Sequence, residues 1–419
     1  MSYRLLTAAI LAAWLAAPAG AVASEDPPPY NPHHAKGEPS VSYLPLDAPA
    51  GMSQAVVVEG LPLVHTRQLL PLDREGKVVG EGSVDRQIEQ VLSNLEAVLK
   101  ASGSDLTFLV RLNVYAIAPQ TVDRVRELLG KRLHSPVRSA ISAVLTPLTR
   151  HKALVAVDAV AFAAATKVSN HGVVLHRCEA VAGDKQYADA AVLPRGGVAY
   201  LSGVPDEGTL TVPPVVKSMS RLMKTLAELR LSPCNVVSIR VFLKPATAAD
   251  EVLDALKKFF PGQITPPVTF VEWIASVPVE IEMIASLPPA GKAARSVEYY
   301  TPPDLRPAHT FSRAALVHTE RQIYVSGLYA RAAGKGEAQA TDVFEQLKAI
   351  LDQAGGDMQH LVKASYYVCD DDAGRGFDRV RPRFFDQLHP PAASKVMVHG
   401  AGRVQRTLTM DMIAVGPQP

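Results

Sequence analysis

The chain has 419 residues, of which 47% are hydrophobic and 20% are charged. This balance is sufficient to bury large apolar cores and excludes a disordered polyelectrolyte, and the length favours about two to four domains. The formal net charge is only +2, and no basic tract alternates with aromatic residues. Nucleic acid is therefore not an expected partner, because binding to phosphates needs a concentrated positive surface.

The first 23 residues have the pattern of a cleavable secretory signal. A basic residue, Arg4, precedes an apolar run, and the small residues Ala21-Val22-Ala23 follow it. The apolar run is shorter than the roughly 20 residues of a membrane-spanning helix. We therefore expect a periplasmic or secreted protein that has no membrane association after cleavage. Residues 24–40, "SEDPPPYNPHHAKGEPS", are proline-rich and polar and predict a disordered linker.

Beyond this linker the predicted elements follow one order. Residues 83–103 predict an amphipathic helix, 108–118 a strand, 121–133 a short charged helix and 154–163 a final strand. The same order recurs twice, with amphipathic helices at 213–233 and 340–357, strands at 235–245 and 360–370, short helices at 249–260 and 377–388, and final strands at 278–286 and 407–415.

The recurrence predicts three tandem domains, at residues 41–165, 171–288 and 295–416. Each has the order ββαβαββ and repeats at about 125 residues, which is a whole-domain period. Two helices on one side of a mostly antiparallel sheet make an α+β domain, and the other face of the sheet must be covered. We therefore expect the three sheets to face one another around an approximate threefold axis, with sheets inside and helices outside, in a monomeric pseudo-trimer.

Several chemical signatures are absent from the sequence. There is no nucleophile elbow, phosphate loop, dinucleotide fingerprint or Cys/His zinc spacing, so we expect no cofactor and no metal. The run 370–372, "DDD", is typical of a solvated turn before a helix that begins near Phe377. The three cysteines, Cys178, Cys234 and Cys369, leave at least one thiol unpaired, and the sequence does not say whether two of them pair.

One charged residue is out of place in an apolar stretch. In "SPVRSAISAVL", residues 135–145, Arg138 opens a run of β-branched and small residues that otherwise predicts a core strand. This segment, together with "NLEAVLKASG", "FLVRLNVYA" and "ALVAVDAVA", resembles the Rid family, the YjgF-type imine deaminases. The resemblance covers 41–165 well and 171–288 and 295–416 with weaker motifs.

The resemblance implies a chorismate-mutase-like fold and a family of homotrimers, here fused end to end. Family members bind 2-imino or enamino acids in clefts between subunits and hydrolyse them to 2-keto acids and ammonia, without cofactor or metal. By this resemblance Arg138 binds the substrate carboxylate, the backbone of Ala140 contacts the ligand, and Asp158 positions water. Asp158 departs from the Glu that is more frequent in the family. Met52 departs from the family's aromatic residue near the domain start.

The other two repeats supply weaker counterparts of these residues. The aromatic position corresponds loosely to Tyr187 and Phe311, and the family's hydroxyl before a glycine to Thr66, Ser202 and Ser326. An alignment on the proline before the strand places Thr269 and Ala393 opposite Arg138. The acidic position is retained, as Asp158, Glu282 and Asp411. We therefore expect one family-type pocket per chain and two altered clefts.

An arginine suits this chemistry because its planar fork of donors matches a carboxylate. Hydrolysis of an imine is already fast, so that fixing the substrate in position supplies the main effect, while Asp158 holds the attacking water. Structural alternatives remain open: Arg138 in an interdomain ion pair, Asp158 as a cap or ion-pair partner, and Tyr187 in ordinary packing. Functional alternatives are a noncatalytic module that binds small carboxylates and, following the family's older label, an endoribonuclease.

Overall fold

The computed structural model describes residues 39–135, 138–164, 172–206, 212–289 and 295–417. The predicted signal and nearly all of the predicted linker lie outside these residues. In the described part of the chain, no helix is both long and apolar enough to span a membrane. Cys178 is buried, Cys369 is partly buried and Cys234 is exposed, and none of the three forms a disulfide.

Each repeat contains three strands before its first helix, one more than the sequence predicts. The first repeat consists of β1 (Ser40–Leu44), β2 (Ala55–Glu59), β3 (Leu63–Thr66), α1 (Val84–Ala101), β4 (Leu109–Ala116), α2 (Gln120–Leu133), β5 (Ala140–Leu145) and β6 (Val155–Phe162). The extra strand β1 is only half-buried, which weakens the alternation that would reveal it in the sequence.

The other two repeats follow the same order. The second consists of β7 (Val174–His176), β8 (Ala190–Leu193), β9 (Gly197–Asp206), α3 (Val212–Glu228), β10 (Val236–Leu243), α4 (Ala249–Leu256), β11 (Val268–Glu272) and β12 (Val279–Leu287). The third consists of β13 (Val297–Tyr300), β14 (Ala314–Val317), β15 (Arg321–Leu328), α5 (Gly336–Ala354), β16 (Leu361–Val368), α6 (Asp371–Val380), β17 (Ala392–Met397) and β18 (Leu408–Ala414).

The first helix shows why the predicted helices form. Ser83 is its N-cap and accepts a hydrogen bond from the backbone N–H of Arg86 at 3.4 Å. Leu92 and Leu95 are fully buried on its inner face. The helix ends where Gly103 takes a positive φ of 78°, a conformation that glycine adopts without strain.

The prediction of a solvated turn at 370–372 is wrong. Asp370 is the N-cap of α6 and accepts a hydrogen bond from the N–H of Ala373 at 2.7 Å, and Asp371 begins the helix. Carboxylates are favoured here because the first N–H groups of a helix lack partners within it. Asp372 also accepts a hydrogen bond from the N–H of Gly336 at 2.7 Å, which ties α6 to the start of α5.

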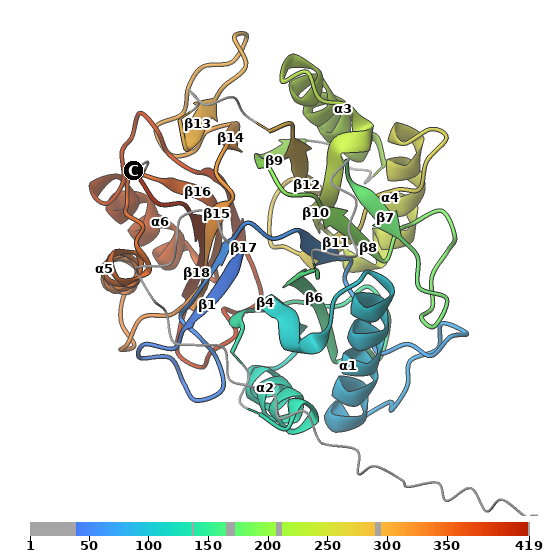
Figure 1. The fold of residues 1–419 in the computed structure, drawn as a ribbon. Helices are drawn as coiled ribbons and strands as arrows, with labels where there is room; N and C mark the ends of the chain where they lie inside the picture. Colours follow the sequence, from blue (N-terminus) through green and yellow to red (C-terminus); the bar gives the residue numbers. More distant parts are fainter. Residues whose placement is uncertain (1–38, 136–137, 165–171, 207–211, 290–294, 418–419) are drawn as a thin grey trace, which may run out of the picture.

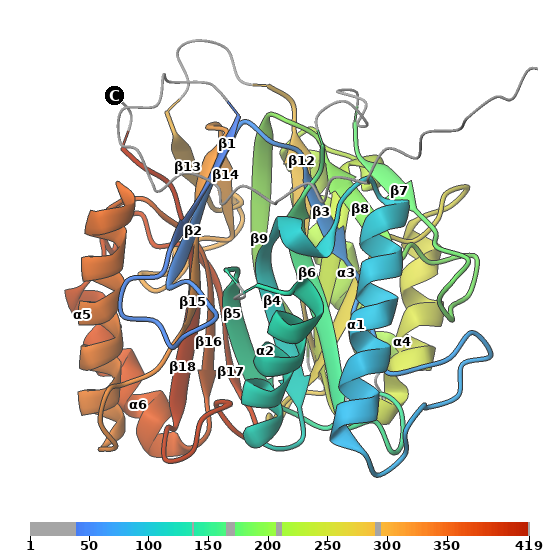
Figure 2. The same ribbon diagram turned by 60° about the horizontal axis from the view of Figure 1, so that its bottom comes forward.

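The three six-stranded sheets surround a common centre, with the helices on the outside (Figure 1). The fold is therefore the predicted α+β arrangement of tandem YjgF-type repeats. The strand orders are β5-β4-β6-β3-β8-β7, β11-β10-β12-β9-β14-β13 and β17-β16-β18-β15-β2-β1. Figure 2 shows the helices lying against the outer faces of the sheets.

These orders mean that every sheet contains strands of two repeats. Strand β8 of the second repeat pairs with β3 of the first, with Leu193 opposite Leu63. Strand β14 of the third repeat pairs with β9 of the second. Strand β2 of the first repeat pairs with β15 of the third, with Val57 opposite Ile323, which closes the ring within one chain. The sheets thus do not follow the domain boundaries predicted from the sequence.

The connections that allow this exchange are short and meet at one end of the molecule. Segments of three residues, 60–62, 194–196 and 318–320, link β2 to β3, β8 to β9 and β14 to β15. The N–H of Gly60 donates a hydrogen bond to the carbonyl of Glu320 at 3.2 Å. The carboxylate of Glu320 in turn pairs with Arg195 at 2.7 Å. Each of the three links therefore contacts another link.

Substitution of Val57 by proline tests the exchanged pairing. Val57 lies in the middle of β2, between Ser42 of β1 and Ile323 of β15, where proline removes a donor from the sheet. We expect the Val57→Pro variant to lose on the order of 3 kcal/mol of unfolding free energy in urea denaturation. The control Val41→Pro, on the edge strand β1, should lose much less. Equal losses in the two variants would contradict the exchanged pairing, because β2 would then behave as an edge strand like β1.

Candidate functional site

A layer of charged and polar side chains lies on the axis between two apolar clusters. Along β4, Val110 belongs to the first apolar cluster, Arg111 and Asn113 to the polar layer, and Tyr115 to the second cluster. β10 and β16 follow the same sequence of apolar, polar and apolar residues. We call the polar layer the axial ring; it comprises Arg111, Asn113, Asp158, Arg240, Glu282, Lys363, Ser365 and Asp411, which line a cavity of about 60 Å³.

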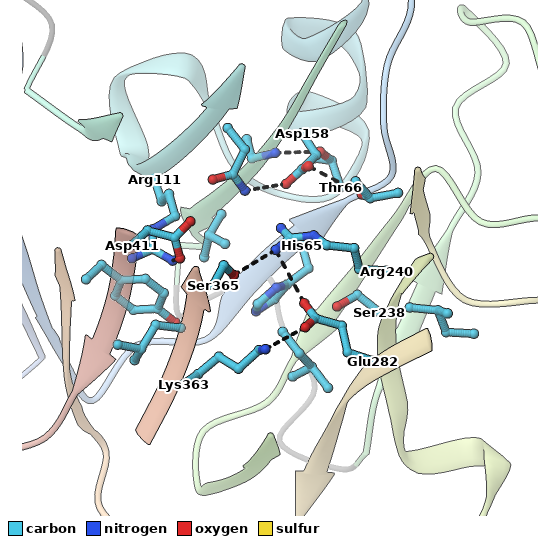
Figure 3. Close-up of a pocket in the computed structure, with 18 of the residues that line it drawn as sticks. His65, Thr66, Arg111, Asp158, Ser238, Arg240, Glu282, Lys363, Ser365 and Asp411 are labelled. Atoms are coloured by element: carbon cyan, nitrogen blue, oxygen red, sulfur yellow. Dashed lines mark hydrogen bonds and ion pairs between the residues drawn. The ribbon is translucent and has the colours of Figure 1, made fainter. Parts of the chain in front are cut away.

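Two ion pairs of the axial ring connect different repeats, and a third, between Arg240 and Glu282 at 3.4 Å, lies within the second repeat (Figure 3). Arg111 of the first repeat pairs with Asp411 of the third at 3.3 Å, and also donates to the carbonyls of β15 and β18 at 2.7 and 2.8 Å. Lys363 of the third repeat pairs with Glu282 of the second at 2.6 Å. Three cations thus face three carboxylates in a buried layer, where unpaired charges would be costly.

The local pKa shifts agree with this pairing. Burial acts to raise the pKa of Glu282, but Lys363 and Arg240 hold it below its ordinary value. Burial, together with the charge of Arg111, lowers the pKa of His65 to about 4, so that this buried imidazole is neutral at neutral pH. Glu282 is therefore ionised beside its two cations, and His65, which also lines the cavity, adds no positive charge to them.

Asp158 lies in the axial ring, away from the outer clefts. Its carboxylate accepts hydrogen bonds from Asn113 at 2.7 Å, Tyr115 at 2.5 Å and Thr269 at 3.3 Å. The predicted ligand-binding residue Thr66 is also inside the molecule, where its hydroxyl oxygen accepts a hydrogen bond from the N–H of Ala159 at 2.9 Å. These contacts account for both residues structurally, and their predicted part in catalysis or binding stays a prediction.

Three clefts lie between neighbouring repeats, and equivalent hydrogen bonds mark two of them. In the cleft between repeats 1 and 3 (the 1/3 cleft), the hydroxyl of Ser326 accepts from the N–H of Ile141 at 2.8 Å. In the cleft between repeats 2 and 3 (the 2/3 cleft), the hydroxyl of Ser202 accepts from the N–H of Ala393 at 2.8 Å. In the cleft between repeats 1 and 2 (the 1/2 cleft), Arg67 replaces these serines.

The 1/3 cleft is the largest of the three. Its volume is about 770 Å³, against about 350 Å³ for the 1/2 cleft and about 380 Å³ for the 2/3 cleft. One wall consists of β5 with the β1–β2 loop and α2; the other consists of β15, α5 and the loop before β18. Its lining includes Met52, Gln54, Asp123, Arg126, Ile141, Ser326, Tyr329, Gln346 and Arg403.

The 1/3 cleft combines an apolar floor with cationic groups. Arg126 pairs with Asp123 at 3.0 Å, and Arg331 pairs with Asp342 at 2.7 Å. Arg403 is exposed at the rim, and among the described residues it has no ion-pair partner. A small ligand that carries both an apolar group and a negative charge would match this lining.

Arg138 lies two residues before β5, the strand that forms one wall of the 1/3 cleft. It is half-buried, and it lies near Tyr43 of β1: burial raises the pKa of Tyr43 to about 12, against the opposing effect of the Arg138 charge. Ala140, the first residue of β5, is fully buried and bridges to Ser53, next to the cleft residue Met52. Ala140 therefore lies beside Ser53, the neighbour of Met52, whereas neither Arg138 nor Ala140 is among the described residues that line this cleft.

The remaining predicted residues lie in other clefts. Tyr187 lines the 1/2 cleft, where burial and then nearby carboxylates, Asp254 first, raise its pKa to about 12. Ser202 lies beside the 2/3 cleft, which the flanking Leu201 and Val204 line, and it donates a hydrogen bond to the carbonyl of Ser312 at 2.5 Å. The structure thus distributes the candidate residues over the axial ring and three clefts instead of gathering them in one pocket.

The positions predicted to correspond to Arg138 need correction. One backbone hydrogen bond recurs in all three repeats. It runs from the N–H of Ser53 to the carbonyl of Ser139 (3.2 Å), from Ala188 to Thr265 (2.8 Å) and from Ser312 to Pro391 (3.1 Å). The residues before these acceptors, Arg138, Ile264 and Pro390, are therefore equivalent. Thr269 instead lies opposite Arg240 in the β10–β11 pairing, as Ser142 lies opposite Asn113, and Ala393 corresponds to Ile141. The error arose because the proline and the strand are separated by different lengths of chain.

Glu280 is a buried carboxyl group that the sequence analysis did not identify. It lies opposite Phe242 in the β10–β12 pairing, the position that Ala156 and Thr409 occupy in the other repeats. Burial raises its pKa to about 7, with smaller effects from Ser394, Glu282, Lys363 and Arg313. The sequence offered one clue to this group. The segment "VEIE", 279–282, has two carboxylates on one face of the strand, whereas the equivalent segments "VAVD" and "LTMD" have only the second.

Within the described ranges, no His, Cys, Asp or Glu side chains are grouped as a metal site requires.

The fold and the clefts define an α+β protein of three related repeats with pockets at the repeat boundaries. Residues 45–163 and 302–415, more than half of the chain, match the family model of the Endoribonuclease L-PSP family. The chain belongs to this family, which is the Rid/YjgF family that the sequence resembles. The segment between the two matches includes the second repeat.

Several similar proteins match this chain over about the length of one repeat. Protein DfrA from Myxococcus xanthus is 32% identical over 97 residues, which are 23% of this chain and 74% of that protein. Protein HMF1 from Saccharomyces cerevisiae is 30% identical over 103 residues, 24% of this chain and 78% of that protein. The structure of the Rid family protein YyfB from Yersinia pestis shares 27% identity, covers 27% of this chain and 86% of its own, and has a TM-score of 0.25.

Removal of one charge tests the axial ring. Arg111→Met leaves Asp411 buried without its ion pair, so we expect a loss of about 3 to 5 kcal/mol of unfolding free energy in chemical denaturation. The control Arg126→Met removes a more exposed ion pair and should cost less than about 1 kcal/mol. The double variant Arg111→Met/Asp411→Leu should recover most of the loss. A double variant as unstable as the single one would contradict the pairing.

Proposed function

We propose that the chain binds small 2-imino, 2-enamino or 2-keto carboxylates in the 1/3 cleft and accelerates hydrolysis of the imines to 2-keto acids and ammonia. The observation that carries this proposal is the position of Arg138, two residues before β5, the strand that forms one wall of the largest cleft. Family membership supports it, as does the mixture of apolar and cationic groups in the lining.

In the proposed reaction, the guanidinium of Arg138 holds the substrate carboxylate through paired, charge-assisted hydrogen bonds. Water adds to the C=N carbon, and the resulting carbinolamine expels ammonia as the carbonyl forms, so that one water is consumed for each ammonia released. The intrinsic barrier is low, and orientation of the substrate supplies most of the acceleration. The exposed Asp47 and Asp123 are the carboxylates in the cleft that can exchange protons with bulk water.

One observation favours binding without turnover as a second candidate. The position in the third repeat that corresponds to Glu280 is occupied by Thr409, which cannot act as a base, and Asp158 is held by three donors in the axial ring. A cleft with an arginine and no buried carboxylate can bind a carboxylate ligand without catalysing proton transfer. Turnover by orientation alone would still be measurable, because it does not need such a base.

A trapping assay tests the catalytic proposal. An amino acid oxidase generates the imino acid, and semicarbazide traps it unless the protein hydrolyses it first. Wild type should suppress trapping, and Arg138→Ala should need about tenfold or more protein for equal suppression, since two charge-assisted hydrogen bonds are lost. The control Arg150→Ala removes an exposed ion pair with Asp250, at 2.9 Å, and should behave as wild type. Equal suppression by wild type and Arg138→Ala would rule out this use of Arg138.

A thermal-shift measurement distinguishes the two candidates. Stabilisation of wild type by 2-keto acids, lost in Arg138→Ala and accompanied by no suppression of trapping, would establish a binding module. Suppression of trapping with the same dependence on Arg138 would establish the deaminase.

We also propose that the chain is exported and acts as a monomer. Residues 1–23 support export by their signal-like pattern, and closure of the third sheet by β1 and β2 of the same chain supports a monomeric ring. Expression of the full chain in a Gram-negative host should yield a periplasmic protein whose first residue, by mass spectrometry, follows residue 23. Sedimentation should give the mass of one chain. An intact first residue in the cytoplasmic fraction would refute the export proposal.

A further inference from the structure

The 2/3 cleft contains a half-buried guanidinium that has no ionic partner. Arg313, just before β14, lies over the ring of Phe311 at 4.9 Å. Among the described residues, no carboxylate forms an ion pair with it. Burial and then the charge of Arg221 lower the pKa of Arg313, against a smaller opposing effect of Glu280. A partly desolvated cation of this kind is stabilised by an anion from solution.

The other charged groups of the cleft are already paired. Lys224 bridges Asp304 and Glu228, and Arg221 pairs with Asp206 at 3.1 Å. The volume of about 380 Å³ falls in the range of small-molecule sites. The remaining lining is largely apolar and includes Leu201, Val204, Leu222, Pro302 and Leu305.

We propose that the 2/3 cleft is a second ligand site, which binds a small monocarboxylate with an apolar tail through Arg313. The equivalent residue of the 1/3 cleft is Gln54: the carbonyl of Arg313 accepts from the N–H of Ser202 at 2.9 Å, as that of Gln54 accepts from Ser326 at 2.8 Å. Arg138 has no counterpart here, since its equivalent is Pro390. The two sites would therefore hold a carboxylate with cations from different positions.

Glu280 gives this second site a pH dependence. Its carboxyl group occupies the space where a side chain at Gly203 would lie, since a Cβ there would be 1.8 Å from Oε1 of Glu280. The groups that face it are Ser394, Glu282, Lys363 and Arg313, from four different segments of the cleft and the ring. With burial its pKa is about 7, so that Glu280 is protonated in mild acid and competes for Arg313 once it ionises.

The competition between Glu280 and the ligand for Arg313 also favours a ligand with a single negative charge. A carboxylate carries one negative charge and can bind beside a protonated Glu280, whereas a phosphate dianion would add a second negative charge near Glu282 and Glu280. The apolar lining further favours an organic tail over an inorganic ion. We therefore expect 4-methyl-2-oxopentanoate, a branched keto acid, to bind and inorganic phosphate not to bind.

Calorimetric titration of wild type with 4-methyl-2-oxopentanoate at pH 6 tests the proposal. We expect two binding events; Arg313→Gln, which installs the residue of the equivalent position, should lose one of them by at least tenfold in affinity. Arg138→Ala should retain that event, so that failure of the proposed function in the 1/3 cleft and failure of this site are distinguishable. An Arg313→Gln variant with unchanged affinities and stoichiometry, or wild type that binds phosphate equally well, would overturn the proposal.

Two further measurements do not depend on the folding of Arg313→Gln. In wild type, the affinity of the Arg138-independent event should fall about tenfold from pH 6 to pH 8, as expected for competition by a group with a pKa near 7. The Glu280→Gln variant should abolish this fall. Crystals of wild type soaked with 4-bromobenzoate should show anomalous bromine density in the 2/3 cleft. A bromine found only in other clefts, or a pH dependence retained in Glu280→Gln, would refute the site.

Discussion

The axial ring is the constraint on which the rest of the molecule depends. Three cations and three carboxylates lie between two apolar clusters, where each charge needs a partner because burial removes its hydration. The ion pair between Arg111 and Asp411 joins the first repeat to the third, and that between Lys363 and Glu282 joins the third to the second. A shift of one repeat along the axis would separate these pairs. The ring therefore fixes how the repeats are placed, and that placement creates the three clefts.

Fusion of the repeats into one chain allows the clefts to differ. In a symmetric homotrimer every cleft would have the same residues, whereas here Arg138, before β5, and the buried carboxyl group of Glu280 lie beside different clefts. The 1/2 cleft has neither, and Arg67 in its lining pairs with the buried Asp189 at 2.7 Å. The three clefts thus present three different sets of side chains on one scaffold.

Much of the fold, and less of the site, could be predicted from the sequence. Apolar periodicity located the helices and the central strands, and comparison of the repeats correctly grouped Asp158, Glu282 and Asp411. Alternation along a strand shows which residues share a face, but not whether that face meets a cleft or the axis, so that the location of Asp158 was not predictable. The exchange of strands was also hidden, because a link of three residues can close a hairpin or cross to another sheet.

The exchanged strands have a consequence for how such a chain can evolve. Each sheet contains four strands of one repeat and the first two strands of the next. An isolated repeat would therefore lack two strands of its own sheet, and its own first two strands would have no sheet to join. Loss of one repeat by deletion would therefore expose unpaired N–H and C=O groups along a strand edge, which invites aggregation. Gain or loss of a repeat is therefore viable only when the circle is completed in another way, for example by separate chains.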